Sequence, residues 1–117
     1  MHVIDCGAER ATPITEYASR GASAQPLGDG AGEAHVYVVH LEPGGEIGAH
    51  PAGFDQLFLV VRGEGWVAGA DGARHLVRAG HGAVIARGEV HAKGSDSGCS
   101  AVMIQLTELA LPATVRK

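Results

Sequence analysis

Two histidines and a glutamine stand out in this 117-residue chain as groups that could coordinate a metal ion. His50 and Gln56 lie at the start of a long apolar run. His91 follows a second apolar run, which is flanked by glycines. Imidazole suits Zn, Cu, Fe or Ni, and an amide oxygen suits harder ions. Because both imidazoles must be neutral to bind, we expect metal occupancy to fall below a pH of about 6.5.

Strand geometry would bring these side chains together. Residues two apart in a strand share a face, so His50, Ala52 and Gln56 are predicted to face one interior. His91 would reach the same interior from a neighbouring strand, and a small β-barrel has room for one small ligand. The predicted metal ligands are His50, Gln56 and His91. The residues predicted to line the pocket are Tyr37, Ala52, Phe58 and Met103, with ordinary core packing as the alternative for Phe58 and Met103.

The pattern around these residues predicts short strands joined by tight turns. β-Branched and aromatic runs alternate with Gly, Pro and Asp-Gly signals, and no convincing helix is present. This favours an all-β sandwich or barrel. The predicted strands are 34–41, a short strand leading to His50, 56–61, 66–68, 74–77, 83–86, 90–92 and 100–106, with a turn or bulge at 63–65.

The run from Gln56 to Val61 is apolar on both faces. Gln56 and Phe58 share one face, while Leu57, Leu59 and Val61 share the other. Both faces must therefore be covered. One would line the barrel, and the other needs a second sheet, the N-terminal segment or a second subunit. We expect a homodimer.

The length fits a single domain, residues 1–117. Its core is predicted at about residues 34–106, with an N-terminal arm at 1–33 and a tail at 107–117. Within the arm, 14–18 is expected to be a short strand or a helical turn, and 21–32, rich in Gly, Ala and Ser, a loop.

Composition excludes several classes of function. Nine basic and 13 acidic residues give a net charge of −4 without a basic cluster, which argues against a nucleic-acid partner. No apolar run approaches the roughly 20 residues that span a membrane, and the first residues do not resemble a signal peptide. We expect a cytoplasmic protein with a small-molecule ligand, in which Cys6 and Cys99 are reduced thiols.

The glycine and histidine spacing resembles the first of the two motifs of the cupin superfamily, which are small jelly-roll barrels. That motif has Gly, five residues, His, one residue, His, three or four residues, Glu, six residues and Gly. Here Gly44, His50, Ala52, Gln56 and Gly63 fall in that register.

The second cupin motif has Gly, five residues, Pro, one residue, Gly, two residues and His. Gly80, Ala86, Gly88 and His91 match its register, with Ala86 where proline is usual. The resemblance covers roughly residues 34–106 and implies a jelly-roll fold.

The departures from these motifs bear on function. A full cupin site resembles a cage of three His and one Glu. This chain keeps the first and last histidines, His50 and His91, but has Ala52 for the second and Gln56 for the carboxylate. The resemblance therefore implies an incomplete ligand set with weaker affinity for a divalent ion, and Zn, Fe, Mn, Ni and Cu are not distinguished.

Two functions follow from the resemblance, and the sequence does not choose between them. One is a metal-dependent enzyme acting on a small organic acid, phenol or sugar derivative, although no catalytic base is identifiable. The other is a non-catalytic ligand-binding or sensing module with a metal-free pocket, in which Gln56 hydrogen-bonds His50 or His91. A structural dimer with a relict pocket is a third alternative.

The other histidines are predicted to have ordinary roles. His75 and His81 follow turns or charged residues and are expected in solvent. His35 and His40 lie on opposite faces of one predicted strand, so only one of them could face the barrel interior.

Overall fold

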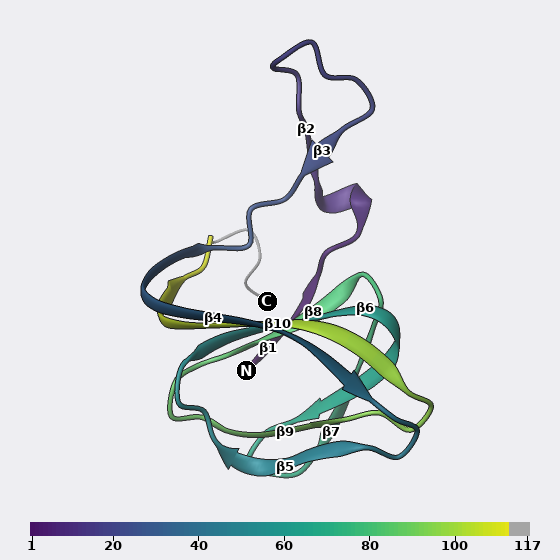
Figure 1. Ribbon diagram of the computed structural model, residues 1–117, viewed down its shortest axis with the longest axis vertical. Helices are drawn as coiled ribbons and strands as arrows, with labels where there is room; N and C mark the ends of the chain where they lie inside the picture. The colour runs from purple at the N-terminus through teal and green to yellow at the C-terminus, as the bar shows by residue number, and fades with distance from the viewer. Residues whose placement is uncertain (113–117) are drawn as a thin grey trace.

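The computed structural model describes residues 1–112, which fold into two antiparallel sheets (Figure 1). The first sheet has the order β1 (His2–Asp5), β8 (His81–Ile85), β6 (Asp55–Ala68), β10 (Cys99–Ala110) and β4 (Asp29–Leu41). The second has the order β5 (Glu46–Pro51), β9 (Val90–Gly94), the latter half of β6, and β7 (Arg74–Arg78). Within residues 1–112 the only helical element is the 3₁₀ turn η1 (Ala8–Arg10), so the all-β prediction is confirmed.

Strand β6 belongs to both sheets. Its first half pairs with β8 and β10, and its second half pairs with β7 and β9. The strand bends where its register with β10 shifts, and Gly63 there has a positive φ of 77°. A Cβ at Gly63 would overlap the Gly98 carbonyl oxygen. The strands predicted at 56–61 and 66–68 are therefore one, because glycine lets the chain turn the corner between sheets without breaking the ladder.

The space between the sheets holds an apolar core. Its buried members are Leu41, Phe58, Val60, Val67, Val77, Ala83, Cys99 and Ala101. Val39, Ile47 and Met103 pack against them from β4, β5 and β10. The core thus draws on strands of both sheets, and this packing holds β5 and β7 against the first sheet.

The outer face of the first sheet is covered in part by the two ends of the chain. Leu57 and Val84 are buried there beneath Ile4 of β1, and Leu109 and Leu111 pack against them. The N-terminal segment therefore does some of the predicted covering. Beyond it, the outward residues Val36, Val38 and Val61 are 67%, 62% and 58% exposed. The homodimer stays a prediction, which sizing in solution would test.

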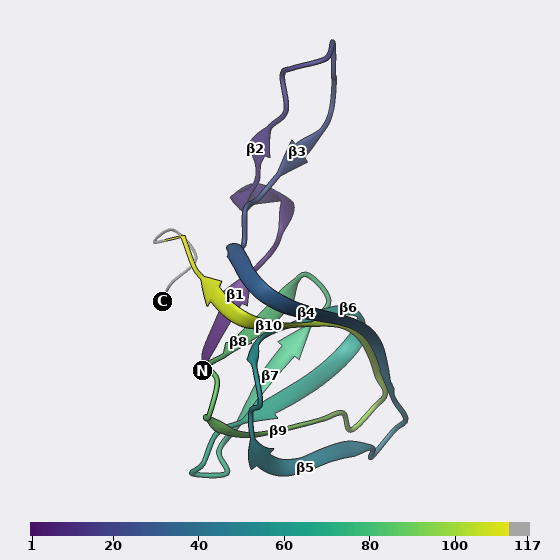
Figure 2. The ribbon, with the colours of Figure 1, turned by 60° about the vertical axis from the view of Figure 1, so that its left-hand side comes forward.

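The N-terminal arm is more structured than predicted. β1 pairs with β8, and β2 (Thr12–Pro13) with β3 (Ser23–Ala24) forms a small hairpin that projects from the barrel (Figures 1 and 2). Residues 14–18, predicted as a strand or helical turn, lie in the connection between β2 and β3. Tyr17 and Ala18 there both have a positive φ.

The boundaries of two long strands also differ from the prediction. β4 begins at Asp29, inside the predicted loop 21–32, and β10 continues to Ala110, inside the predicted tail. The glycines near Asp29 suggested a loop, but backbone pairing of Asp29 with Ala110 carries the ladder through them. The last part of the predicted tail, 113–117, lies outside the described residues.

Two further expectations concern the chain as a whole. Cys6 and Cys99 are both free, as predicted, and burial together with the neighbouring Asp5 carboxylate raises the pKa of the Cys6 thiol. Among the described residues, none of the helical segments has the length and apolarity that crossing a membrane requires.

Candidate functional site

His50 and His91 are direct cross-strand neighbours in the pair formed by β5 and β9. Their ring centroids lie 4.6 Å apart, with an angle of 54° between the ring planes. Residues directly opposite in an antiparallel pair have side chains on the same side of the sheet. The structure therefore brings together two imidazoles that are far apart in the sequence.

Backbone carbonyls orient both rings in the same way. Nδ1 of His50 lies 2.7 Å from the Gly48 carbonyl oxygen, and Nδ1 of His91 lies 3.2 Å from the Glu89 carbonyl oxygen. A carbonyl can only accept, so in each neutral ring Nδ1 carries the proton and Nε2 carries the lone pair. This is the arrangement in which a second contact fixes the tautomer of a metal-binding histidine.

The two rings differ in exposure. His91 is fully buried, whereas His50 is exposed, so the pair lies where the space between the sheets opens to solvent. Burial lowers the pKa of His91, and the nearby charges of Lys93 and His50 lower it further, while the hydrogen bond to the Glu89 carbonyl opposes them. His91 consequently stays neutral, and able to act as a ligand, to a lower pH than an ordinary histidine.

Gln56 lies on the inward face of β6 and is 3% exposed. Its Oε1 atom is buried without a hydrogen-bond partner, and so is Nε2 of His91. The hydrogen bonds of residues 1–112 include none between Gln56 and either histidine. The hydrogen bond between Gln56 and a histidine, which the metal-free alternative predicts, is therefore not formed in this structure.

Nε2 of His91 and Oε1 of Gln56 are atoms of the kind that ligate divalent cations. Buried polar atoms normally have partners, and a lone pair left without one carries a desolvation penalty. The two imidazole nitrogens and the amide oxygen are all lone-pair donors, and the structure shows two of the three residues, His50 and His91, as direct neighbours. In the described part of the chain no group of three or more His, Cys, Asp or Glu side chains could hold a metal ion.

The predicted lining residues occupy different depths. Phe58 is fully buried in the core, and Met103 packs against that core opposite Tyr37, which is 46% exposed. Ala52 is buried, and its N–H donates to the Glu89 carbonyl, the same oxygen that faces Nδ1 of His91. Position 52 therefore supports the backbone behind His91.

The remaining histidines take part in other contacts. His35 meets the Phe54 ring edge-on at 5.3 Å and has Nε2 2.6 Å from a Glu33 carboxylate oxygen, whereas Nδ1 of His40 lies 2.8 Å from the Ser100 hydroxyl. His75 is exposed, as expected. The expectation for His81 is wrong: it is half-buried with Nδ1 shielded, because the unpredicted strand β1 pairs alongside it.

Sequence reasoning missed Lys93, which is 1% exposed. It lies two residues after His91 on β9, with its Cα opposite Ile47 on one side and Val67 on the other. Its Nζ lies 5.4 Å from the centre of the Phe58 ring, and burial lowers its pKa to about 8. The sequence could have indicated that Lys93 faces inward, because it lies two residues after His91 and residues two apart on a strand share a face.

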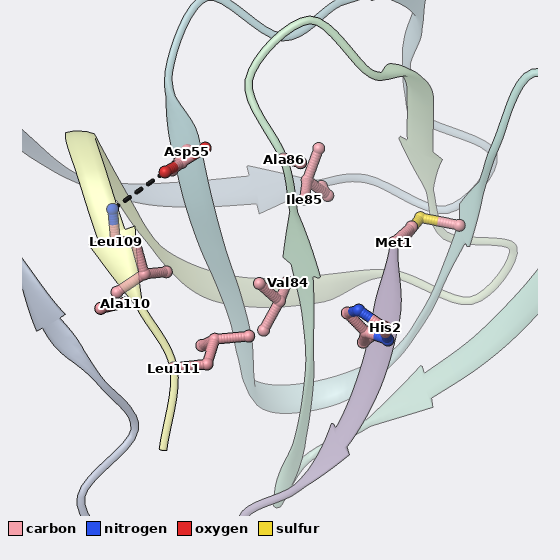
Figure 3. Close-up of a pocket in the computed structure, with 9 residues that line it drawn as sticks. All are labelled: Met1, His2, Asp55, Val84, Ile85, Ala86, Leu109, Ala110 and Leu111. Atoms are coloured by element: carbon pink, nitrogen blue, oxygen red, sulfur yellow. Dashed lines mark hydrogen bonds between the residues drawn. The ribbon is translucent and has the colours of Figure 1, made fainter. Parts of the chain in front are cut away.

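A hollow of about 340 Å³ lies elsewhere, beside β1 and the end of β10 (Figure 3). Val84 and Leu111 contribute apolar walls, and Asp55 accepts a hydrogen bond from the Leu109 N–H at 2.9 Å. The second Asp55 oxygen accepts from the Arg87 N–H at 2.8 Å. None of the predicted site residues lines this hollow, and its carboxylate is used in holding two backbone segments together.

Sequence comparison alone identifies no relative: no known sequence family and no curated protein matches the chain. Solved structures do match. A cupin-2 domain protein of Shewanella frigidimarina has a TM-score of 0.56 at 23% identity, over 68% of this chain and 78% of its own. An RmlC-like cupin of the same organism has a TM-score of 0.59 at 21% identity, over 65% and 68%. The chain therefore has the fold of these cupin proteins.

This likeness of fold confirms the jelly-roll prediction. A protein of Neisseria meningitidis is also similar, with 30% identity, a TM-score of 0.57, and coverage of 79% of this chain and 93% of that chain. Likeness to the two Shewanella structures shows the fold alone. The chemistry of this chain must therefore be argued from its own side chains.

Proposed function

We propose that this chain binds a divalent metal ion through His50, His91 and Gln56, and a small organic molecule beside it. One observation carries the proposal: His50 and His91 face each other with their Nε2 lone pairs directed away from the backbone carbonyls that hold Nδ1. Nε2 of His91 and Oε1 of Gln56 are both buried without partners. A divalent cation is a partner that each of these atoms can take.

A metal held by so few protein ligands keeps positions open for another molecule. There it would supply Lewis-acid polarisation or oxygen activation to a small organic acid, phenol or sugar derivative. The contribution of this chain is to hold two neutral imidazoles in a fixed tautomer at the edge of the core. No residue is assigned as a general base, so the reaction itself stays unassigned.

The second candidate is a non-catalytic binding or sensing module. It is favoured by the sparse donor set within residues 1–112, where no cluster of three His, Cys, Asp or Glu residues exists. A ligand with hydrogen-bond donors would satisfy Nε2 of His91 and Oε1 of Gln56 without a metal. This function needs neither a base nor a complete cage.

Metal binding by matched variants tests the proposal. Tag-free protein would be stripped with a chelator, dialysed against Zn²⁺, Ni²⁺ or Mn²⁺, and assayed for bound metal. We expect about one equivalent for the native chain and more than about 100-fold weaker binding for His91→Ala, because loss of even an outer-shell partner weakens metal sites by 10–100-fold. His75→Ala, which removes an exposed histidine, should bind as the native chain does.

Two results would count against the metal. Binding of less than about a tenth of an equivalent of metal per chain would favour the metal-free module. This holds for reconstitution conditions that load a known Zn²⁺ enzyme. Equal losses in His91→Ala and His75→Ala would show that any bound metal lies outside the proposed site.

A further inference from the structure

Lys93 is a buried cation for which the proposed metal site has no use. It is 1% exposed and lies between apolar neighbours on β5 and β6. The ion pairs of residues 1–112 do not include it, and the contact recorded for its Nζ is the face of the Phe58 ring at 5.4 Å. Lysine is rarely buried fully unless it is paired.

A buried lysine without an ion pair is a strong electrostatic feature. Transfer of a charge from water into an apolar setting is unfavourable, and a contact with one aromatic face offsets only a small part of that cost. An anion placed near Nζ would interact with the ammonium at low local dielectric, where attraction is several-fold stronger than in water. The position is therefore prepared for a negative charge that the described chain does not itself supply.

The position of Lys93 on β9 indicates which class of anion could bind beside it. It shares a strand face with His91, whose partner ring His50 is exposed to solvent. A molecule entering past His50 would meet the imidazole pair first, and the four-carbon stem of Lys93 lets its ammonium move toward it. One cation among apolar side chains suits a single carboxylate on a small organic body. A phosphate ester usually calls for several donors or an arginine fork.

We propose that Lys93 is the anchor for the carboxylate of a small organic acid that binds between the two sheets beside His50 and His91. This deepens the proposed function and rests on it for the position of the ligand. It narrows the ligand from any small organic molecule to a monocarboxylic acid with an apolar or lightly hydroxylated body. In this role Lys93 is a binding residue, which forms an ion pair with the ligand and no covalent bond.

Matched acids and amides test this assignment. Propionate, benzoate, propionamide and benzamide would be titrated into isotopically labelled protein, and the Lys93 side chain and His91 ring would be followed by NMR. We expect both carboxylates to shift these signals and to bind at least about ten-fold more tightly than the amides, since a buried charge pair contributes well over 1.4 kcal/mol. Lys93→Met should remove that preference, and Lys93→Arg should keep part of it.

The titrations would be run on metal-free and on Zn²⁺-loaded protein, which separates the two proposals. A carboxylate preference that depends on Lys93 in metal-free protein supports the anchor even if no metal binds. Metal binding without any carboxylate preference would overturn the anchor and leave the metal site standing. Equal binding of acids and amides, no binding of either acid, or an unchanged preference in Lys93→Met would each overturn it.

Discussion

The two ends of the space between the sheets are built from opposite materials. At one end Phe58, Val60, Val67 and Val77 pack together and are at most 3% exposed, and the polar atom that comes near them is Nζ of Lys93, 5.4 Å from the centre of the Phe58 ring. At the other, His91, Gln56 and Lys93 are just as buried. Nε2 of His91 and Oε1 of Gln56 have no partner in the described chain, and the ion pairs of residues 1–112 do not include Lys93.

The apolar side chains stabilise the barrel, whereas the polar side chains are the ones able to bind a ligand. Apolar packing at the first end stabilises the fold, since each buried aliphatic or aromatic side chain contributes roughly 1.5–3 kcal/mol. The polar end destabilises it, because unpaired buried polar groups cost free energy. Sites that bind or react commonly keep such unfavourable groups, and stability is then lower than the fold could reach. Substitutions at the two ends should therefore have opposite effects.

The largest effect is expected at the apolar end. Phe58→Ala should lower the free energy of unfolding by about 3–5 kcal/mol, because it removes a fully buried ring and leaves a cavity. Urea unfolding would measure this. Val38→Ala, on the exposed outer face, is the control and should change stability by no more than about 0.5 kcal/mol. A Phe58→Ala protein as stable as the control would remove the contrast between the ends.

At the polar end the sign should reverse. Lys93→Met keeps much of the side-chain volume while removing the buried charge, so it should raise the free energy of unfolding near pH 7 by about 1–3 kcal/mol, as replacement of buried charges often does. Unfolding of chelator-treated protein would measure this. A loss of more than about 1 kcal/mol would mean that the ammonium has a stabilising partner in the fold.

The pH dependence of the free energy of unfolding, compared between the native chain and Lys93→Met, tests whether burial of the ammonium is the cause of the difference. Burial lowers the pKa of Lys93 from 10.5 to about 8, so between these values the folded chain has released the proton that the unfolded chain still holds. The contribution of Lys93 to stability therefore rises with pH across this window and is at its most unfavourable below pH 8. The advantage of Lys93→Met over the native chain should shrink from pH 8 to 10.5. A constant difference would show that Lys93 is not desolvated.

A smaller effect is expected for Gln56→Glu. A carboxylate restores the negative charge usual at this position in the resembling motif, so Zn²⁺ binding should tighten by roughly ten-fold, or about 1.4 kcal/mol. Competition with a chromophoric chelator would measure this. Gln25→Glu, in the N-terminal arm, makes the same chemical change away from the site and should leave affinity unaltered. Unchanged binding in Gln56→Glu would exclude residue 56 as a ligand.

Much of this organisation could be predicted because strand periodicity determines side-chain direction. The strands between residues 34 and 106, and the facing of Phe58 against Leu57, follow from alternation and from turn residues. The continuity of β6 could not be predicted, since Gly63 is equally suited to a turn and to a bend between sheets. β1 could not be predicted either, because its place is determined by pairing with a strand far along the chain.

The candidate site divides in the same way. The pairing of His50 with His91 could be anticipated because two motifs share a register with known barrels. Lys93 was missed because a charged residue beside Gly94 looks like the end of a strand approaching a polar loop. Its burial depends on apolar neighbours supplied by β5 and β6, which only the assembled sheets bring into place.

The central claim is that His50 and His91 share one ligand through their Nε2 atoms. Long-range ¹H–¹⁵N NMR of the histidine rings, recorded while Zn²⁺ is added to metal-free protein, tests it directly. The account predicts that both rings begin as neutral tautomers protonated at Nδ1, and that both Nε2 signals shift together and stop changing at one equivalent, while His75 stays unchanged. Coordination through Nδ1, or saturation of other histidines with His50 and His91 unaffected, would contradict it.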